Sequence, residues 1–248
     1  MHPPISVVII AGAEERNIRD CLESVRWADE IVVLHSMNTD ATAGIAREFT
    51  DRVVFRAFDT FSAQREHALA LAAHDWVFAL DADERMLPEL RAEIEARLPE
   101  AGPVAGFFVP RRNYFLGRWM RHGGWYPDMQ LRLFRKSMTR VTQRLVHEGY
   151  VVDGLTASLV HPMDHHTDPT MYHHLIKNVE YTRLEALERR KRVRPRDLLL
   201  HPIGAFLQAW IVRKGWKDGT HGLAAALIHA AYNLQQYLFM WEAGEKRE

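Results

Sequence analysis

The chain has 248 residues, a length that suits one α/β domain with a helical appendage and a substantial buried core. Its 32 lysines and arginines balance 32 aspartates and glutamates, so net charge indicates neither nucleic-acid binding nor strong attraction to an anionic surface. A single cysteine, Cys21, excludes a disulfide framework within the chain and favours a reducing cytosol. We expect no signal peptide before the first apolar run.

Four short apolar runs, separated by helical patterns, occupy the first third of the chain. The runs lie at residues 5–10, 31–34, 53–55 and 76–80 and are rich in β-branched residues. Such runs predict buried parallel strands joined by crossover helices. The expected order is therefore βαβαβαβ, in an open sheet whose ligands bind beyond the carboxyl ends of the strands.

The segments between the runs carry apolar residues at helical spacing. The clearest helix is expected over residues 18–25, where one face is apolar. A second helix is expected to begin at Thr39 or Asp40, and a third carries its apolar stripe at residues 68–72.

Two carboxylates emerge where the fourth run ends, in the sequence Asp81-Ala82-Asp83. Side chains two apart in a strand point to the same side, so Asp81 and Asp83 can face one site. Such a pair suits a hard divalent cation that bridges protein carboxylates to substrate phosphates. The alternative is that Asp83 or Glu84 caps the next helix, which is expected to start near Pro88.

Other nucleotide-binding folds are disfavoured by the first turn, residues 11–15. It lacks the spaced glycines of a dinucleotide-binding turn, and no phosphate loop of the Gly-Lys-Ser/Thr type occurs in the chain. It also lacks the Gly-rich turn and following lysine that a sugar nucleotidyltransferase would need. A single diphosphate held by a metal ion fits the sequence better.

An ordered set of short motifs runs over nearly the whole chain. The motifs lie at residues 5–10, 14–18, 21–25, 27–31, 39–42, 64–65, 80–84, 127–128, 130, 132–135, 146–148, 161 and 215–219. The set resembles family 2 glycosyltransferases of the GT-A fold, and most closely the branch that includes lipopolysaccharide core β-glucosyltransferases. The resemblance implies an α/β fold, with a GT-A (Rossmann-like nucleotide-diphospho-sugar transferase) domain at residues 1–168 and a C-terminal helical appendage at residues 169–248.

The same resemblance implies an inverting, metal-dependent hexosyltransferase. Its donor would be a nucleotide-diphosphate sugar, foremost UDP-glucose. Its acceptor would be a saccharide or lipid-linked saccharide in lipopolysaccharide or cell-envelope glycan synthesis. Asp83 would ligate Mg²⁺ or Mn²⁺, Asp81 would contact the ribose or the metal shell, and Glu148 would take the proton of the acceptor hydroxyl. Further implied roles are donor binding by Ala11, Glu14, His35 and Arg65, acceptor binding by Asp128, Gln130 and Arg132, and metal or diphosphate binding by His161.

Several of these residues have plainer alternatives. Glu148 could form a surface ion pair with Arg144 or Arg135, Arg132 a structural salt bridge, and Arg65 a solvated charge on a helix. Five histidines gather between residues 161 and 174, yet their loose spacing matches no closed zinc site, and a polar loop lining an acceptor cleft is the preferred interpretation.

Three positions depart from the family pattern. His35 stands where an aspartate usually reads the donor base, Ala11-Gly12-Ala13 replaces a Thr-Lys-Asn turn, and Glu66 replaces an asparagine. A neutral imidazole offers one acceptor and one donor, which puts uridine specificity in question. These changes sustain a second hypothesis, a catalytically inactive glycosyltransferase-like protein used for binding or scaffolding.

From residue 170 the sequence becomes helical, with apolar stretches at residues 198–212 and 222–241. Polar residues interrupt both stretches, so neither has the uninterrupted apolar length that a bilayer demands. Tryptophans and basic residues at their ends suit a helix lying in a membrane interface, while a core-completing helical pair or a dimer contact is the alternative. We expect a cytoplasmic protein, peripheral on the inner face of a bacterial inner membrane.

Overall fold

The computed structural model describes residues 2–142, 149–167, 170–189 and 192–245. It divides into two compact units. The first comprises Met1–Arg111 and Met129–His165, and the second comprises Arg112–Asp128 and His166–Glu248. The second unit thus contains the C-terminal helices together with a segment from the middle of the chain.

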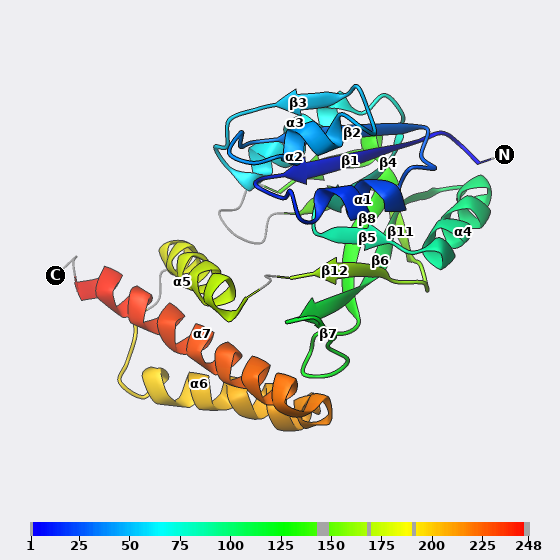
Figure 1. The fold of residues 1–248 in the computed structure, drawn as a ribbon. Coiled ribbons are helices and arrows are strands. Elements are labelled where there is room, and N and C mark those ends of the chain that lie inside the picture. The colour runs from blue at the N-terminus through cyan, green and yellow to red at the C-terminus, as the bar shows by residue number, and fades with distance from the viewer. Residues whose placement is uncertain (1, 143–148, 168–169, 190–191, 246–248) are drawn as a thin grey trace. The chain divides into compact units, whose positions relative to one another are not determined.

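The first unit begins with a parallel sheet in the strand order β3-β2-β1-β4. The strands are β1 (Ile5–Ala11), β2 (Glu30–His35), β3 (Val53–Phe55) and β4 (Trp76–Asp81), as the apolar runs predict (Figure 1). Three helices connect them: α1 (Ile18–Ser24), α2 (Thr42–Ala46) and α3 (Phe61–Leu71). The expected βαβαβαβ order is therefore confirmed.

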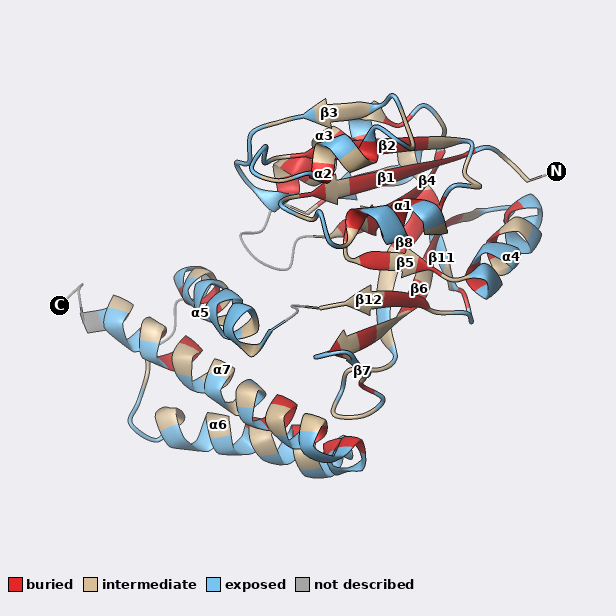
Figure 2. Ribbon diagram, viewed as in Figure 1, coloured by how far each residue is buried: buried red, intermediate tan, exposed pale blue. Residues whose placement is uncertain are grey.

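Both faces of this sheet are covered, which explains why its strands read as continuous apolar runs. Ile5, Val7 and Ile9 point into a core that α1 completes, whereas Val8 points into a second core beneath α3. Figure 2 shows the buried colour on the central strands and the exposed colour on the outer sides of the helices. Alternate residues of one strand thus serve two hydrophobic cores.

The remaining strands extend the sheet beyond β4 in the order β8-β6-β12-β5. They are β5 (Glu84–Met86), β6 (Val104–Phe115), β8 (Asp128–Arg135) and β12 (Met163–His166), with β7 (Arg118–Trp119) and β11 (Leu155–Ser158) paired to β6. A separate hairpin joins β9 (Thr139–Val141) to β10 (Tyr150–Val152). Short 3₁₀ turns occupy Leu98–Glu100 and Lys136–Met138.

Helix α4 (Pro88–Arg97) tests the capping alternative for the acidic motif. Its N-cap is Leu87, and no side chain caps it. The idea that Asp83 or Glu84 caps this helix is therefore wrong, because Glu84 instead begins strand β5 with its side chain wholly buried.

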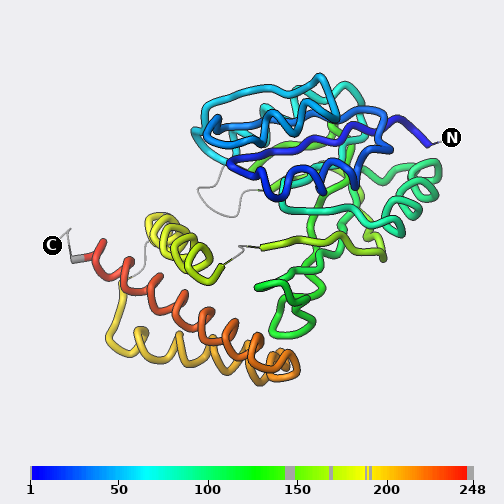
Figure 3. The backbone as a smooth tube through the Cα atoms, viewed as in Figure 1, coloured from blue at the N-terminus to red at the C-terminus, as the bar shows by residue number. Residues whose placement is uncertain are grey.

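The second unit contains α5 (Met171–Glu188), α6 (Asp197–Leu207), a π-helical turn (Gln208–Val212), a 3₁₀ turn (Gly215–Asp218) and α7 (Gly219–Glu245). Both α5 and α6 pack against α7, as the backbone trace in Figure 3 also shows. No helix in the described part of the chain is long and apolar enough to cross a membrane.

Asp218 connects the segment Arg112–Asp128 to the C-terminal helices by hydrogen bonds. Its carboxylate accepts hydrogen bonds from the backbone N–H groups of Arg121 and His122, at 3.1 and 2.8 Å, and lies 3.0 Å from His122 Nδ1. This buried carboxylate explains why the 215–219 motif lies next to a loop nearly a hundred residues away in sequence.

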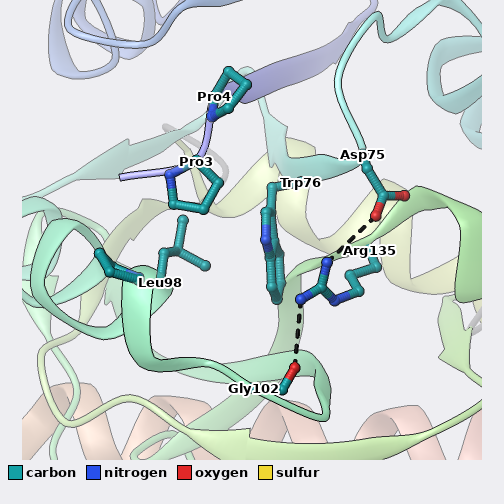
Figure 4. A pocket seen from close by; sticks show the side chains of 8 residues that line it. Pro3, Pro4, Asp75, Trp76, Leu98, Gly102 and Arg135 are labelled. Carbon is teal, nitrogen blue, oxygen red and sulfur yellow. Dashed lines mark hydrogen bonds and ion pairs between the residues drawn. The ribbon is translucent and has the colours of Figure 1, made fainter. Parts of the chain in front are cut away.

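A cavity of about 350 Å³ opens at the amino ends of β1 and β4 (Figure 4). Pro3, Pro4, Trp76 and Arg135 line part of it. The Arg135 guanidinium lies 4.6 Å from the centre of the Trp76 ring and 3.6 Å from Asp75. Because Trp76 is the first residue of β4 and Asp81 the last, this cavity is at the other end of the sheet from the acidic motif.

Candidate active site

The parallel register aligns the carboxyl ends of three strands at one edge of the sheet. Ala11 of β1 lies opposite His35 of β2, and Ile10 lies opposite Asp81 of β4. The sequence therefore correctly placed Ala11, His35 and Asp81 along a single edge, where ligands of open α/β sheets bind.

Asp81 lies between two arginines from distant parts of the chain. Arg132 Nη2 on β8 donates to Asp81 Oδ2 at 2.6 Å, and Arg65 Nη2 on α3 lies 3.3 Å from Oδ1. Oδ1 is buried and accepts no hydrogen bond. Burial alone would raise the pKa of Asp81, but the charges of Arg132 and Arg65 outweigh it and hold that pKa well below its usual range. Asp81 is therefore an ionised carboxylate whose two oxygens lie against two different arginines.

The buried carboxylate of Glu84 contacts both Arg132 and the backbone of Asp81. Its Oε1 accepts hydrogen bonds from Arg132 at 2.5 Å and from Arg111 at 3.0 Å, and its Oε2 accepts one from the backbone N–H of Asp81 at 3.0 Å. One carboxylate thus fixes two guanidinium groups and the end of β4.

Sequence reasoning considered Glu84 only as a helix cap and missed this role. The alternation of side chains along β5 could have indicated that Glu84 is buried, because Glu84 and Met86 share one side of the strand. Arg85 points to the other side, where its Nη2 lies 3.3 Å from Asp20 Oδ2 on α1.

Guanidinium groups gather around these carboxylates. Three arginines, Arg65, Arg111 and Arg132, surround Asp81 and Glu84. Asp83 is a third carboxylate in the same motif, so the charges of the three arginines are balanced. Planar guanidinium groups bind phosphate oxygens well, and the edge of the sheet therefore offers groups that suit a phosphate-bearing ligand.

Asp83 lies beside a histidine that the sequence did not single out. His165 Nε2 on β12 is 3.3 Å from Asp83 Oδ2, and both side chains are about four-fifths buried. His161, the expected metal or diphosphate ligand, lies in the turn between β11 and β12. Its ring and its backbone N–H both contact Glu93 of α4, at 2.9 and 2.8 Å. The structure thus brings His165, rather than His161, to the acidic motif.

The donor set was compared with the needs of a metal ion. Over residues 2–142, 149–167, 170–189 and 192–245, no group of three or more acidic, histidine or cysteine side chains could hold an ion by itself. Mg²⁺ commonly takes only one or two protein carboxylates and completes its shell with substrate phosphates and water, and Asp81 and Asp83 are two carboxylates of this motif.

His35 is buried, with only 2% of its surface exposed. Its Nδ1 lies 3.2 Å from the Met37 carbonyl oxygen, and its ring centre is 5.3 Å from that of Phe55. A carbonyl only accepts, so this contact assigns the proton to Nδ1 and leaves Nε2 as an acceptor.

The other expected donor residues surround the first turn and α3. The Glu14 carboxylate accepts a hydrogen bond from Asn17 at 2.8 Å, and the Glu14 backbone N–H donates to Thr42. Glu66 is exposed on α3, whereas Arg65 is mostly buried. Tyr150, which sequence reasoning missed, lies beneath Arg65, whose guanidinium is 5.7 Å from the ring centre. Burial raises the pKa of its phenol.

The expected acceptor residues fall in both units. Gln130 and Arg132 are two apart on β8, so they share one side of that strand. Asp128 belongs to the second unit, where it accepts a hydrogen bond from Asn113 at 3.1 Å. Arg132 forms the salt bridges that were its plainer alternative.

Glu148, the expected base, and Arg144, one of its expected ion-pair partners, lie outside the described residues. The other expected partner, Arg135, pairs with Asp75.

Comparison with known proteins decides the family. Residues 6–152 match the model of Glycosyl transferase family 2, more than half of the chain. This chain belongs to glycosyltransferase family 2. It is 30% identical over 250 residues to the lipopolysaccharide core biosynthesis glycosyltransferase LpsC of Rhizobium meliloti, covering 92% of this chain and 88% of that protein. It is 36% identical over 92 residues to the uncharacterized glycosyltransferase RC0292 of Rickettsia conorii, covering 37% of this chain and 33% of that one.

A solved structure shows the same fold. S. aureus TarS 1–349, in complex with UDP, superposes with a TM-score of 0.51 at 13% identity, over 99% of this chain and 92% of that one. The expected GT-A fold with C-terminal helices is thereby confirmed. As a family 2 enzyme, this glycosyltransferase moves a sugar from a nucleotide-sugar donor by the inverting course typical of the family.

The first prediction concerns Glu84. Glu84→Gln keeps the side-chain shape but leaves the buried Arg132 and the partly buried Arg111 without their shared charge partner, a loss that costs about 3 kcal/mol or more. We expect the free energy of unfolding, measured by urea denaturation, to fall by about that amount. Glu100→Gln, on the exposed 3₁₀ turn, is the matched control and should be neutral. Equal stability of the two variants would refute the central role of Glu84.

Proposed function

We propose that this glycosyltransferase is a metal-dependent hexosyltransferase that uses a uridine diphosphate sugar, foremost UDP-glucose. The observation that carries the proposal is the Asp81-Ala82-Asp83 turn at the carboxyl end of β4, where a low-pKa carboxylate lies among arginines. This arrangement offers carboxylate oxygens to a cation and guanidinium groups to the diphosphate that the cation would share.

In the proposed reaction, Asp83 and Asp81 would hold Mg²⁺ or Mn²⁺. When bound, the ion supplies charge neutralisation for the departing nucleoside diphosphate. Arg65 and Arg132 orient the same phosphates, and His35 Nε2 accepts the uracil N–H. The acceptor oxygen forms a bond to the anomeric carbon from the face opposite the breaking carbon–oxygen bond, and its proton passes to Glu148.

We further propose a saccharide or lipid-linked saccharide of the cell envelope as acceptor, bound with the help of Asp128 and Gln130. The similarity to LpsC of Rhizobium meliloti, named for lipopolysaccharide core biosynthesis, supports this substrate class. Such acceptors are anchored in a membrane, so the enzyme is proposed to work as a peripheral protein at the inner face of a bacterial inner membrane.

The test is calorimetric titration with uridine, guanosine and adenosine diphosphate sugars, each with and without Mn²⁺, followed by a transfer assay with the best donor. Metal-dependent binding of UDP-glucose is the expected result. Absence of binding for every donor would favour the non-catalytic scaffold instead.

The second prediction concerns the metal. Asp83→Ala removes a carboxylate at a partly exposed strand end and should abolish Mn²⁺-dependent nucleotide binding without unfolding the protein. Asp59→Ala, an exposed carboxylate in the loop before α3, serves as control and should bind as the parent does. Calorimetry that shows unchanged Mn²⁺ dependence in the Asp83 variant would remove Asp83 from the metal site.

The third prediction concerns the base. Glu148→Gln retains size but cannot accept a proton, so turnover should fall by about two to four decades while donor affinity stays the same. Initial rates at saturating donor measure this. Turnover equal to that of the parent would assign the proton to another group, with Asp128 the next candidate.

The fourth prediction concerns His35. His35→Asp supplies the carboxylate usual in the family and should strengthen uridine diphosphate binding by about 1 kcal/mol, because a hydrogen bond to a charged acceptor is stronger than one to a neutral ring nitrogen. Competitive titration against guanosine and adenosine diphosphates measures the change in selectivity. Thermal unfolding must accompany it, because a buried aspartate cannot donate to the Met37 carbonyl. Identical nucleotide affinities in a folded variant would place His35 outside the base pocket.

A further inference from the structure

Helix α6 and the π-helical turn after it carry apolar side chains that no other element covers. From residue 198 to residue 212 the sequence contains no lysine, arginine, aspartate or glutamate. The uncovered side chains are between 43% and 73% exposed and comprise Leu199, Leu200, Ile203, Leu207, Ile211 and Val212. Isolated exposed leucines are ordinary, but a continuous group of this size marks an interaction surface.

These side chains form one stripe because of helical geometry. Successive residues of an α-helix are rotated by about 100°, so positions 199, 200, 203 and 207 fall within about 100° of arc. Ala205 lies on the opposite side and is buried, as is Ala209 in the following turn. On the side away from the stripe, Leu198 packs against Tyr237 and Met240 of α7, and the His201 ring stacks on Tyr237.

Basic residues flank the stripe at both ends. Before it stand four exposed arginines, and after it stand Arg213, Lys214 and Lys217, also exposed. The four arginines are Arg189, Arg192, Arg194 and Arg196. Trp216 is half-exposed, with the Lys217 ammonium 5.6 Å from its ring centre. The whole chain is electrically balanced, so this positive charge is a local concentration.

The acidic groups at the two ends of the stripe do not neutralise it. The Asp197 side chain is only 14% exposed, and its carboxylate accepts a hydrogen bond from the Arg194 backbone. The Asp218 carboxylate is 5% exposed and is occupied by Arg121 and His122. The surface that α6 presents to a partner is therefore apolar in the middle and cationic at its ends.

The charges at the two ends of the stripe favour an anionic bilayer over a second copy of this chain as the partner. A second copy of this chain would bring an identical surface with the same cationic ends. An anionic bilayer offers phosphate groups to the basic ends and an apolar boundary to the stripe, which is how amphipathic helices lie in a membrane interface.

We propose that α6 and the turn Gln208–Val212 lie flat in the headgroup region of an anionic lipid bilayer. The proposal deepens the membrane-associated part of the proposed function, and it does not depend on the chemistry at Asp81. It identifies the apolar stripe as the inserted surface and the flanking arginines and lysines as its electrostatic anchors. Lipid-anchored acceptors would then be met by diffusion within the membrane plane.

Co-sedimentation of the full-length protein with vesicles tests the proposal. One set of vesicles contains phosphatidylcholine alone and the other contains phosphatidylglycerol in phosphatidylcholine. The parent should bind the anionic vesicles, and binding should weaken as salt rises. Ile203→Ser with Leu207→Ser should lower the partition coefficient about a hundredfold, since two inserted side chains are lost. Lys214→Gln with Lys217→Gln should lower it several-fold and reduce its salt dependence.

Leu155→Ser is the matched control, because Leu155 is 62% exposed on β11 of the first unit. It should bind vesicles as the parent does. All replaced side chains are exposed, and thermal unfolding verifies that each variant folds. Equal binding of both vesicle types, no binding to either, or parent-like binding of the Ile203/Leu207 variant would overturn the proposal. So would concentration-dependent dimerisation that the same variant abolishes, measured by analytical ultracentrifugation without lipid.

The donor titration separates this proposal from the proposed function. If vesicle binding holds while no nucleotide sugar binds, the catalytic proposal fails and the membrane surface stands. If the protein binds the donor but does not bind anionic vesicles, the membrane proposal fails and the catalytic proposal stands.

Discussion

The candidate active site depends on one buried carboxylate, that of Glu84. It lies among Arg111, Arg132 and the backbone of Asp81, so three separate parts of the chain converge on a single group. Burying such charges costs more solvation energy than their attraction reliably returns, and a core of apolar residues would serve stability as well. We therefore interpret the role of Glu84 as one of positioning. It holds the Arg132 guanidinium and the ionised Asp81 in a fixed geometry at the edge of the sheet.

The same network explains how a carboxylate can stay charged while largely enclosed. Desolvation works against ionisation of Asp81, and the nearby arginines overcome it. The guanidinium groups of Arg65, Arg111 and Arg132 are thus held in place by these carboxylates before any ligand arrives. Because these charged groups are already fixed in position, little reorganisation energy is needed when an anionic group binds.

Much of the first unit could be predicted from sequence because its signals are local. Strands covered on both faces read as unbroken apolar runs, and the Asp81/Asp83 pair follows directly from the end of one of them. The contacts of Glu84 could not be predicted in this way, since its partners are 27 and 48 residues away in the chain. The proximity of His165 to Asp83 depends equally on the pairing of β12 with β5, which no short motif encodes.

His35 and the helical region show two other limits. The sequence identified His35 as a departure from the family, but its burial and its contact with the Met37 carbonyl follow from how β2 ends and how Phe55 packs. In the C-terminal region, hydrophobic periodicity predicted the helices well. It could not tell which apolar face of α6 packs on α7, because Leu198, which packs there, and Leu199, which is exposed, are the same residue type.

The alternation of side chains along β5 makes the spacing of the acidic motif as important as its composition. Glu84 and Met86 point inward, and Arg85 points toward α1 and Asp20. Insertion of one residue after Asp83 that shifted β5 by one position would turn Glu84 outward and bring the Arg85 cation to the buried position of Met86. The number of residues between the end of β4 and Glu84 is thus a fixed dimension of the site.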